Sequence, residues 1–550
     1  METKSSSEGG VAGVELEASP QMSTTGGSAR PRPQAPNARI DVKRRAVKLH
    51  FLAACALGPA IALAQSPPER DGLAIVAEIE KTLVDVIAAV EPSVVAISRV
   101  AGPQQQANNE QSAIIVEAFG DLQPAARSQA ETVAAGVIID PAGLVLTEFL
   151  AVRKGDTHSV TLTNGETYPA EIKAADPRSG LAVLAIKTKD DEEAQASFPA
   201  VHFGNADELR KGQFVLALGN PYAIRTDGQP TASWGIVTNL ARKAPAGTNL
   251  NNAPGPSQDY RTTVHHLGTL IQTDAALGWS ASGGALVNLR GELVGLTTTA
   301  SAIAGHEQPA GYAIPMSATF RRIIDTLKEG REVEYGLLGV NLGMSVPTGG
   351  NAAEPRVVVQ HAYAGSPGDL AGLKMGDVLL GVNGKPVHDV DQLQLSVSLL
   401  PPSTETIIEY ARGGNSATTR VKLAKLGVTG GKIVTNRPPA WRGIHVDYAT
   451  AIDAFKLAQA IDSKAIDPAG CVLVVEVEPE SDAAKAGIQA GKFISHVGGK
   501  RVRTPAEFFA AAQSVGSTGE KLDIKLTQPV QPPDENDAGA KNPGGEPPQP

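Results

Sequence analysis

Two neighbouring segments, SGGALVN at Ser282–Asn288 and GELVG at Gly291–Gly295, indicate the fold class most clearly. The serine and the two glycines favour a tight turn, because glycine adopts left-handed backbone conformations at little steric cost. The run that follows, Leu293–Thr299, is rich in Leu, Val and Thr, which is typical of a β-strand. Similar runs, separated by Gly, Pro, Asn and Asp, recur toward the N-terminus: Ser93–Ile97, Gly136–Ile139, Ser159–Leu162, Leu181–Ile186 and Phe214–Leu218. Many short strands with such turns predict a mainly β barrel or sandwich.

Length and composition limit the class of protein. The 550 residues are too many for one core and suggest about three or four folded units. The net charge is -9 and the longest basic run is Lys43–Arg45, so nucleic acid is not an expected partner. Common zinc and phosphate signatures are missing, and the two cysteines, Cys55 and Cys471, form no paired motif. We therefore expect no metal and no cofactor.

The N-terminus has the features of an export signal. Residues 1–42 are rich in Ser, Gly, Pro and Ala, which predicts a disordered extension. Residues 43–64 have the order of a signal peptide, with the basic Lys43–Arg45, an apolar centre and Ala62-Leu63-Ala64 at the end. We expect cleavage near Gln65, export to the periplasm and no transmembrane span afterwards. A membrane anchor made by an uncleaved signal and lipid attachment at Cys55 are the alternatives.

Helical patterns flank the strand-rich region, and the rest of the chain contains a weak duplication. Apolar residues at helical spacing predict helices at 73–89 and 320–330, and residues 101–130 are expected to form a long loop. Beyond the second helix, GSPGDLAGLKMGDVL at Gly365–Leu379 is repeated in weaker form as ESDAAKAGIQAGKFI at Glu480–Ile494. The expected domains are 65–330, 331–427 and 436–527, with a disordered tail at 528–550.

Several separated stretches resemble the HtrA/Deg (DegP-like) family of trypsin-like serine proteases with two PDZ domains, over about residues 73–526. They follow the family's order and include Gly136–Asp140, Leu218–Tyr222, Ile271–Ala276, Ser282–Asn288 and Gly311–Pro315. The resemblance implies a mainly β fold, in which a chymotrypsin/trypsin-like double β-barrel with the active site between the barrels precedes two PDZ-like α+β domains. It also implies a homotrimer, to which the helix at 73–89 adds the only support from the residues themselves.

The resemblance also assigns catalytic positions. Acyl transfer by serine needs a nucleophile, an imidazole that takes its proton and a carboxylate that orients the imidazole. Ser282 matches the family's nucleophile, but the histidine position is Leu150 and the aspartate position is Gly180. The oxyanion-hole position, a glycine in the family, is Ser280. We therefore expect a catalytically inactive pseudoprotease in which Ser282 is kept because Ser-Gly-Gly suits a tight turn.

An active protease is the alternative. The chain is then a serine-type endopeptidase in periplasmic protein quality control, whose base is one of three other histidines: His158, His265 or His266. For His265 and His266 we expect a surface role instead. For Asp176 we expect a turn role before Pro177. A third interpretation is a structural, oligomeric scaffold whose cleft binds nothing.

The duplicated modules resemble PDZ domains, which bind peptide C-termini by strand addition while backbone N–H groups hold the carboxylate. The resemblance assigns these groups to Leu338, Gly339 and Val340 in the first module. In the second module it assigns them to Ile444, His445 and Val446, where a histidine takes the place of glycine. The expected partners are peptide C-termini or unfolded polypeptides. Roles as spacers or assembly contacts are the alternative, more so for the second module.

Overall fold

The computed structural model describes residues 72–100, 132–188, 197–220, 230–244, 263–276, 282–298, 311–345, 355–428, 430–515 and 524–527. The predicted N-terminal extension, signal peptide, long loop and C-terminal tail lie outside these ranges, and so does Ser280. Within them, none of the helices combines the length and the apolar character needed to cross a membrane.

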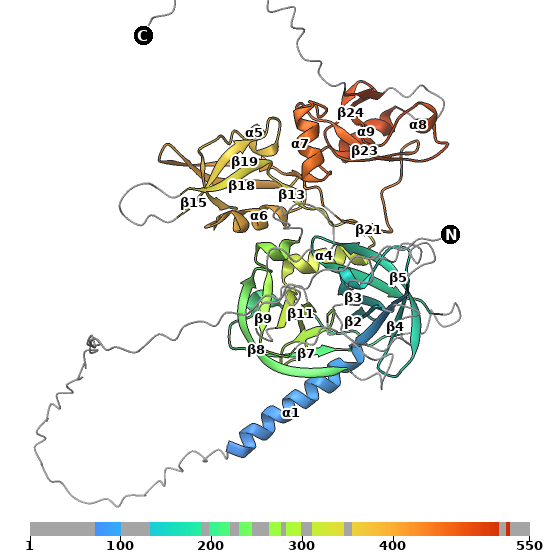
Figure 1. Ribbon diagram of the computed structural model, residues 1–550, viewed down its shortest axis with the longest axis vertical. Coiled ribbons are helices and arrows are strands. Elements are labelled where there is room, and N and C mark those ends of the chain that lie inside the picture. Colours follow the sequence, from blue (N-terminus) through green and yellow to red (C-terminus); the bar gives the residue numbers. More distant parts are fainter. Residues whose placement is uncertain are drawn as a thin grey trace, which may run out of the picture. The chain divides into compact units, whose positions relative to one another are not determined.

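The first six strands form a barrel, closed by pairing between β5 and β6 (Figure 1). The strands are β1 (Val94–Val100), β2 (Thr132–Asp140), β3 (Leu144–Glu148), β4 (Thr157–Thr161), β5 (Thr167–Asp176) and β6 (Leu181–Ile186). Branched apolar side chains such as Ile97 and Val145 fill the interior. Gly136 makes room for them, because a Cβ atom there would lie 2.6 Å from a Val145 methyl group and 2.8 Å from Ile97 Cδ1.

The next six strands form a second closed barrel, in which β7 pairs with β10. They are β7 (Phe214–Gly219), β8 (Thr231–Arg242), β9 (Leu270–Thr273), β10 (Ala285–Val287), β11 (Leu293–Thr298) and β12 (Gly311–Pro315). The expected double β-barrel is therefore confirmed. Each of the six strand-like runs noted in the sequence lies on one of these strands, whereas more polar strands such as β8 and β5 were not predicted.

Two long helices accompany the barrels, close to the predicted positions. Helix α1 (Gly72–Val90) buries only Val86 and Val90 and leads into the 3-10 turn η1 (Glu91–Ser93). Helix α4 (Ala318–Lys328) begins after Ser317, whose hydroxyl accepts a hydrogen bond from the Phe320 N–H. Its apolar face joins one core cluster with side chains of both barrels, including Leu181 and Leu216.

The first C-terminal module contains a sheet with the strand order β14-β15-β16-β18-β19, so that β14 is an edge strand. The strands are β14 (Val340–Ser345), β15 (Arg356–Ala362), β16 (Val378–Val382), β18 (Glu405–Arg412) and β19 (Asn415–Lys422), and β17 (Lys385–Pro386) pairs with β16. Strands β13 (Gly336–Leu337) and β20 (Ala424–Lys425) pair separately. The helices are α5 (Pro367–Leu370) and α6 (Val390–Ser398).

The second C-terminal module repeats this plan with β22 at the edge of its sheet. Its elements are β22 (Ile444–Tyr448), α7 (Ala454–Asp462), β23 (Val472–Val477), α8 (Asp482–Lys485), β24 (Phe493–Val497), β25 (Lys500–Arg501), α9 (Pro505–Ser514) and β26 (Ile524–Leu526). The duplication is visible in detail at α5 and α8. Each of these helices begins after a serine, Ser366 or Ser481, whose hydroxyl accepts a hydrogen bond from the backbone three residues later.

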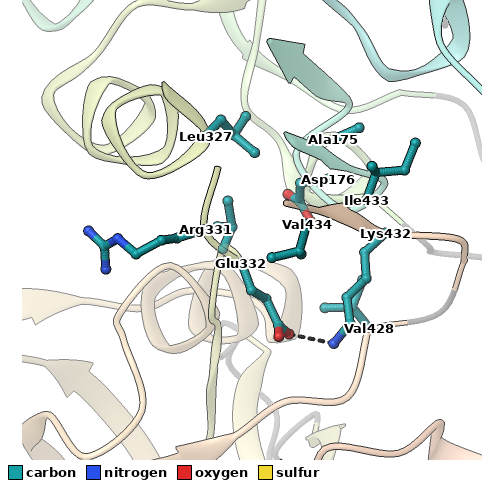
Figure 2. A pocket seen from close by; sticks show the side chains of 10 residues that line it. Ala175, Asp176, Leu327, Arg331, Glu332, Val428, Lys432, Ile433 and Val434 are labelled. Atoms are coloured by element: carbon teal, nitrogen blue, oxygen red, sulfur yellow. Dashed lines mark hydrogen bonds and ion pairs between the residues drawn. The ribbon is translucent and has the colours of Figure 1, made fainter. Parts of the chain in front are cut away.

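The segment between the two modules is bound to the first barrel. Its strand β21 (Ile433–Val434) pairs with β5 and adds a seventh strand to that sheet. The hydroxyl of Thr435 donates a hydrogen bond of 2.6 Å to the carbonyl of Lys173. Figure 2 shows the small pocket beside this junction, where α4, the end of β5 and the two connecting segments meet around Asp176 and Glu332. Nothing in the sequence predicted this strand.

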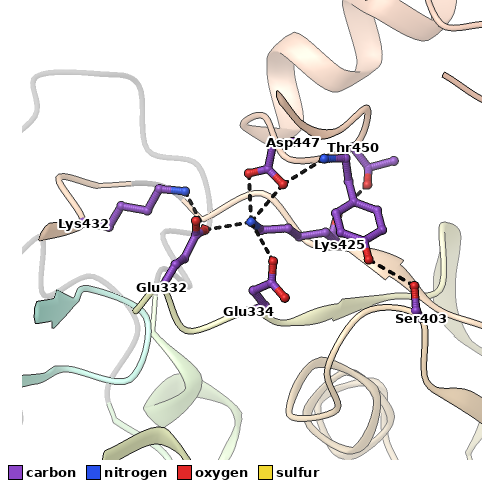
Figure 3. Close-up of polar contacts among 8 residues, drawn as sticks. Glu332, Glu334, Ser403, Lys425, Lys432, Asp447 and Thr450 are labelled. Atoms are coloured by element: carbon purple, nitrogen blue, oxygen red, sulfur yellow. Dashed lines mark hydrogen bonds and ion pairs between the residues drawn. The ribbon is translucent and has the colours of Figure 1, made fainter. Parts of the chain in front are cut away.

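A buried lysine joins three separate segments of the chain. The ammonium of Lys425, whose side chain is 4% exposed, lies 2.8 Å from Asp447, 3.0 Å from Glu332 and 3.1 Å from Glu334 (Figure 3). Burial by itself lowers the pKa of Lys425, but the three carboxylates raise it above its ordinary value. This Lys425 cluster ties the segment that follows α4 and the end of the first module to β22 of the second.

We expect Lys425→Met to lower the free energy of unfolding by about 3 kcal/mol, because removing one partner of a buried ion pair leaves the carboxylates uncompensated. Urea denaturation followed by circular dichroism measures this loss. Lys385→Met is the matched control, since Lys385 is exposed on β17. Equal midpoints for the two variants would contradict a stabilising role of the cluster.

Candidate active site and peptide-binding loops

Ser282 lies in the turn that enters β10, and this turn is held between the two barrels. The Ser282 carbonyl accepts a hydrogen bond of 2.9 Å from the N–H of Ala135 on β2, and the Gly283 N–H donates to the Thr297 carbonyl on β11 at 2.8 Å. Gly283 has a φ of +84°, and a Cβ atom there would lie 2.2 Å from the Ala135 carbonyl oxygen. Only glycine fits this position, so the turn role expected for the Ser-Gly-Gly stretch agrees with the structure.

Glu148, the last residue of β3, is the hydrogen-bond acceptor for the Ser282 hydroxyl. Its side chain is buried, with 7% of the residue exposed. Burial raises the pKa of Glu148 to about 7, although hydrogen bonds from the Ser282 and Thr298 hydroxyls act in the opposite direction. The site therefore contains a serine and a carboxyl group that is about half ionised at neutral pH.

Leu150 lies in the 3-10 turn η4 (Phe149–Ala151) directly after β3. The turn is fixed by a 2.8 Å hydrogen bond from the Phe149 N–H to the Gly180 carbonyl. The Leu150 side chain is apolar and the residue is 36% exposed. The position that the resemblance gives to the catalytic histidine thus presents a surface that neither accepts nor donates a proton.

A side chain at Gly180 would be strained. Its φ is +70°, and a Cβ atom there would meet His265 Nε2 at 3.2 Å and Ile314 Cδ1 at 3.7 Å. A side chain at position 180 would therefore press against the imidazole of His265.

The surface role expected for His265 and His266 is wrong, because the two residues are 3% and 5% exposed. His265 Nε2 donates to the Ser179 carbonyl at 2.8 Å, which leaves Nδ1 to accept from the Thr269 hydroxyl at 2.7 Å. Burial lowers the pKa of His265 to about 4, so the ring is neutral. His266 takes part in the capping box of η6 (Val264–Leu267) with Thr263. Nothing in the sequence His265-His266 predicted that the side chains of this short turn would be buried.

His158 and Asp176 serve the first barrel. His158 is 3% exposed on β4, its Nε2 accepts a 3.3 Å hydrogen bond from the Arg153 N–H, and burial together with nearby Arg99 lowers its pKa. In the sheet order β4 is separated from β3 by β1 and β2, so this ring is remote from Glu148. Asp176 accepts hydrogen bonds from the Ser179 N–H at 2.8 Å and from the Tyr335 hydroxyl. The turn role expected for Asp176 therefore agrees with its contacts.

The first module holds the loop Leu338–Val340 against the start of α5. The Leu338 carbonyl accepts from the Gly368 N–H at 2.8 Å, and the Gly339 carbonyl accepts from the Tyr363 N–H at 3.3 Å. In a trans peptide the N–H points opposite to the preceding carbonyl, so the N–H groups of Gly339 and Val340 point away from these internal donors. Gly339, with a φ of +72°, has no space for a Cβ atom, which would lie 2.5 Å from Ser366 Cβ.

The corresponding loop of the second module is Arg442–Ile444, two residues earlier than the sequence comparison of the two modules placed it. Gly443 has a φ of +84°, and a Cβ atom there would lie 2.2 Å from Ser481 Cβ, which repeats the contact between Gly339 and Ser366. The carbonyls of Arg442 and Gly443 accept from Ala483 and Glu478, as those of Leu338 and Gly339 do in the first module. Assigning the glycine position to His445 was therefore wrong.

His445 and Val446 lie within β22, beyond the loop. His445 Nε2 lies 3.3 Å from a carboxylate oxygen of Glu478 on the neighbouring part of the module. In the loop itself, the Ile444 N–H donates to the Trp441 carbonyl at 2.9 Å. The second loop therefore keeps the glycine but uses one of its N–H groups internally.

Comparison with known proteins agrees with this architecture. The family model of the trypsin-like peptidase domain matches residues 134–296, which include Glu148 and Ser282. The family model of the PDZ domain matches residues 358–412 in the first C-terminal module.

Three curated relatives carry the name probable periplasmic serine endoprotease DegP-like. The protein of Chlamydia pneumoniae is 31% identical over 374 residues, which are 67% of this chain and 68% of the relative. That of Chlamydia trachomatis serovar D is 30% identical over 400 residues, 72% of each chain. That of Pseudomonas fulva is 30% identical over 403 residues, 70% of this chain and 75% of the relative. This chain belongs to the HtrA/DegP family. Among solved structures, HtrA-type protease AlgW with decapeptide is 24% identical with a TM-score of 0.44, covering 65% of this chain and 99% of that one.

Within an HtrA/DegP chain, Glu148 is the functional candidate that sequence reasoning missed. In the sequence, Glu148 is a single carboxylate two residues after the apolar run Leu144–Leu146. The sequence gave no means of bringing it to Ser282, which is 134 positions away along the chain.

We expect Glu148→Gln to stabilise the protein relative to the wild type as the pH rises. The pKa of Glu148 in the fold, about 7, exceeds its ordinary value of 4.5, so its contribution to stability is complete below pH 4.5 and is lost as the pH rises through 7. The wild type should lose about 3 kcal/mol across this interval relative to the permanently neutral glutamine variant. Urea denaturation at pH 4.5 and pH 8 measures the difference. Glu171→Gln, at an exposed position on β5, should show no such dependence.

We expect the double variant Leu150→His/Gly180→Asp to leave casein intact and to be less stable than Leu150→His alone. A side chain at the left-handed Gly180 costs about 1–2 kcal/mol, and the contact with His265 adds to this. Thermal unfolding and a casein assay of both variants measure the two effects. A double variant that cleaves casein would contradict this geometry.

Proposed function

We propose that this protein is an exported, peptide-binding member of the HtrA/DegP family that has lost triad-dependent peptidase activity. The observation that carries the proposal is the pair of substitutions around Ser282. Leu150 offers an apolar, part-exposed side chain, and the space beside Gly180 contains the neutral ring of His265. Without an imidazole and its orienting carboxylate, the serine mechanism keeps only about 10³ to 10⁴-fold enhancement over water, which is negligible for peptide bonds.

The first module supports capture of polypeptide C-termini. Strand β14 lies at the edge of its sheet. In the loop Leu338–Val340, at the start of this strand, the N–H groups of Gly339 and Val340 point away from the hydrogen-bond donors within the module. An extended peptide can add to such an edge while N–H groups bind its carboxylate. Apolar side chains support the edge, since Val340 and Leu342 pack against the core cluster of the module, which includes Leu393 and Val397 of α6.

The second module is proposed as a weaker binder. Its loop has the same glycine conformation, but the Ile444 N–H is used by Trp441. The Arg442 guanidinium lies 5.5 Å from the centre of the Trp441 ring. We assign this module mainly to assembly and spacing, and the Lys425 cluster supports that role because it fixes β22 to the first module.

Periplasmic location and trimerisation belong to the same proposal. The relatives are named periplasmic, and residues 43–64 have the composition of a signal peptide. Helix α1 exposes large apolar side chains, among them Leu73, Val76 and Val84, which supports its use in an assembly contact. An active periplasmic endopeptidase is the second candidate function, and the hydrogen bond between Ser282 and Glu148 is the observation in its favour.

We expect a labelled peptide with a free, apolar C-terminus to bind at least about tenfold more tightly than its amidated form, because the amide has no terminal charge for the N–H groups. Fluorescence anisotropy with the mature protein measures both affinities. Gly339→Ala should abolish the preference, whereas Gly431→Ala, in open space at an ordinary φ, should retain it. In parallel, the wild type and Ser282→Ala should leave casein intact to the same extent. Equal binding of the two peptides would overturn peptide capture, and Ser282-dependent cleavage of casein would favour the endopeptidase.

A further inference from the structure

The hydrogen bond between Ser282 and Glu148 lies in the barrel domain and is not part of the peptide-binding loops of the C-terminal modules. The serine hydroxyl donates to a buried carboxyl group that also receives a hydrogen bond from Thr298. We propose that Glu148 is the proton acceptor for Ser282, and that Ser282 is thereby a nucleophile toward activated esters and thioesters without any imidazole.

Both groups are positioned by the backbone of one residue, Ala135. The N–H of Ala135 donates to the Ser282 carbonyl at 2.9 Å, and the Ala135 carbonyl accepts from the Thr147 hydroxyl at 2.8 Å. Thr147 is the neighbour of Glu148 on β3, and both residues are paired with β6. The nucleophile and its acceptor therefore come from different barrels but are fixed to one point. Such fixed geometry removes much of the entropic cost of proton transfer and attack.

The acceptor has a suitable base strength. A general base works best when its pKa lies near the operating pH. Burial brings the pKa of Glu148 to about 7, which is close to the value of about 6.5 for a free imidazole. The carboxylate form needed for proton transfer is therefore well populated from neutral pH upward.

The chemical step can be written completely. The Ser282 oxygen forms a bond to the acyl carbon of the ester while its proton passes to the Glu148 carboxylate. The bond between the acyl carbon and the leaving oxygen or sulfur breaks, and its electron pair leaves with the phenolate or thiolate. The products are an acyl-serine, a protonated Glu148 and the leaving anion. Glu148 releases its proton to solvent, and water then adds to the acyl carbon. The bond between the acyl carbon and the Ser282 oxygen breaks, that oxygen takes a proton from the water, and the carboxylic acid leaves.

The surroundings of the pair select the substrate class. An amine leaving group must be protonated as it departs, whereas a phenolate or thiolate leaves as an anion. The proton that Glu148 takes from Ser282 is held on a buried carboxyl group and would have to be returned to a departing amine, and Leu150, the part-exposed side chain two residues further on, supplies no other proton. Amides are therefore poor substrates and activated esters are good ones. This inference does not depend on peptide capture, since it concerns the barrels alone.

The experiment uses the mature full-length protein with p-nitrophenyl acetate and with a fluorophosphonate probe. We expect a burst of p-nitrophenolate, an acetyl group on Ser282 by peptide mass spectrometry, and probe labelling whose rate rises with pH to a plateau, half-maximal near pH 7. Ser282→Ala should show neither burst nor labelling. Glu148→Gln should lower both rates by about 100-fold or more, because loss of a general base costs about 10² to 10⁴-fold.

Two controls keep the outcome decisive. Glu171→Gln, which removes an exposed carboxylate of the same barrel, should retain the wild-type rates. Circular dichroism shows whether Glu148→Gln is folded. If this variant is unfolded, the pH dependence of wild-type labelling alone tests the proposal. A wild type that is not labelled, or that is labelled at the same rate from pH 5 to pH 9, would overturn the proposal, as would a folded Glu148→Gln variant that reacts like the wild type.

Discussion

The contact between Gly283 and the peptide group of Ala135 is the constraint on which the rest of the site depends. A Cβ atom at position 283 would come within 2.2 Å of the Ala135 oxygen, so the turn can approach β2 only as glycine. This approach allows the Ala135 N–H to bind the Ser282 carbonyl and joins the second barrel to the first. The serine is kept in place by its backbone, independently of whether a catalytic base is present. A chain can therefore lose the histidine and aspartate positions without losing the geometry at Ser282.

Much of the fold could be predicted because it depends on local patterns. Runs such as Leu181–Ile186 are apolar on both faces and short, and their strands occur where the sequence indicated. The helix at 320–330 was predicted from its apolar spacing, and α4 buries that face. Strand β21 was not predicted, because two residues of strand in a connecting segment have no periodicity, and only its pairing with β5 defines it.

The site was harder to predict because it depends on contacts between distant residues. The sequence indicated that positions 150 and 180 lack a histidine and an aspartate. It did not indicate that His265 lies beside Gly180 or that Glu148 is hydrogen-bonded to Ser282. The error at His445 has a different cause. The loop of the second module can be aligned with that of the first in registers two residues apart, and only the positive φ of Gly443 and its contact with Ser481 decide between them. The buried histidines were mispredicted because histidine is a polar residue, and the sequence gave no indication of the capping box that holds His266 inside the fold.

The pairing of β21 with β5 makes a segment from between the two C-terminal modules a part of the first sheet. Although β21 lies between the two C-terminal modules in the sequence, it covers the end of β5 that extends beyond the pairing with β4, and Thr435 is hydrogen-bonded to Lys173 on that barrel. A chain shortened after the first module would expose a sheet edge that the full-length protein covers, and an uncovered edge is a site for association with other chains. In the full-length protein, β21 therefore protects the end of β5 from association. Genetic truncation, domain exchange or proteolytic cleavage before β21 would remove the second module and would also increase the tendency of the chain to aggregate.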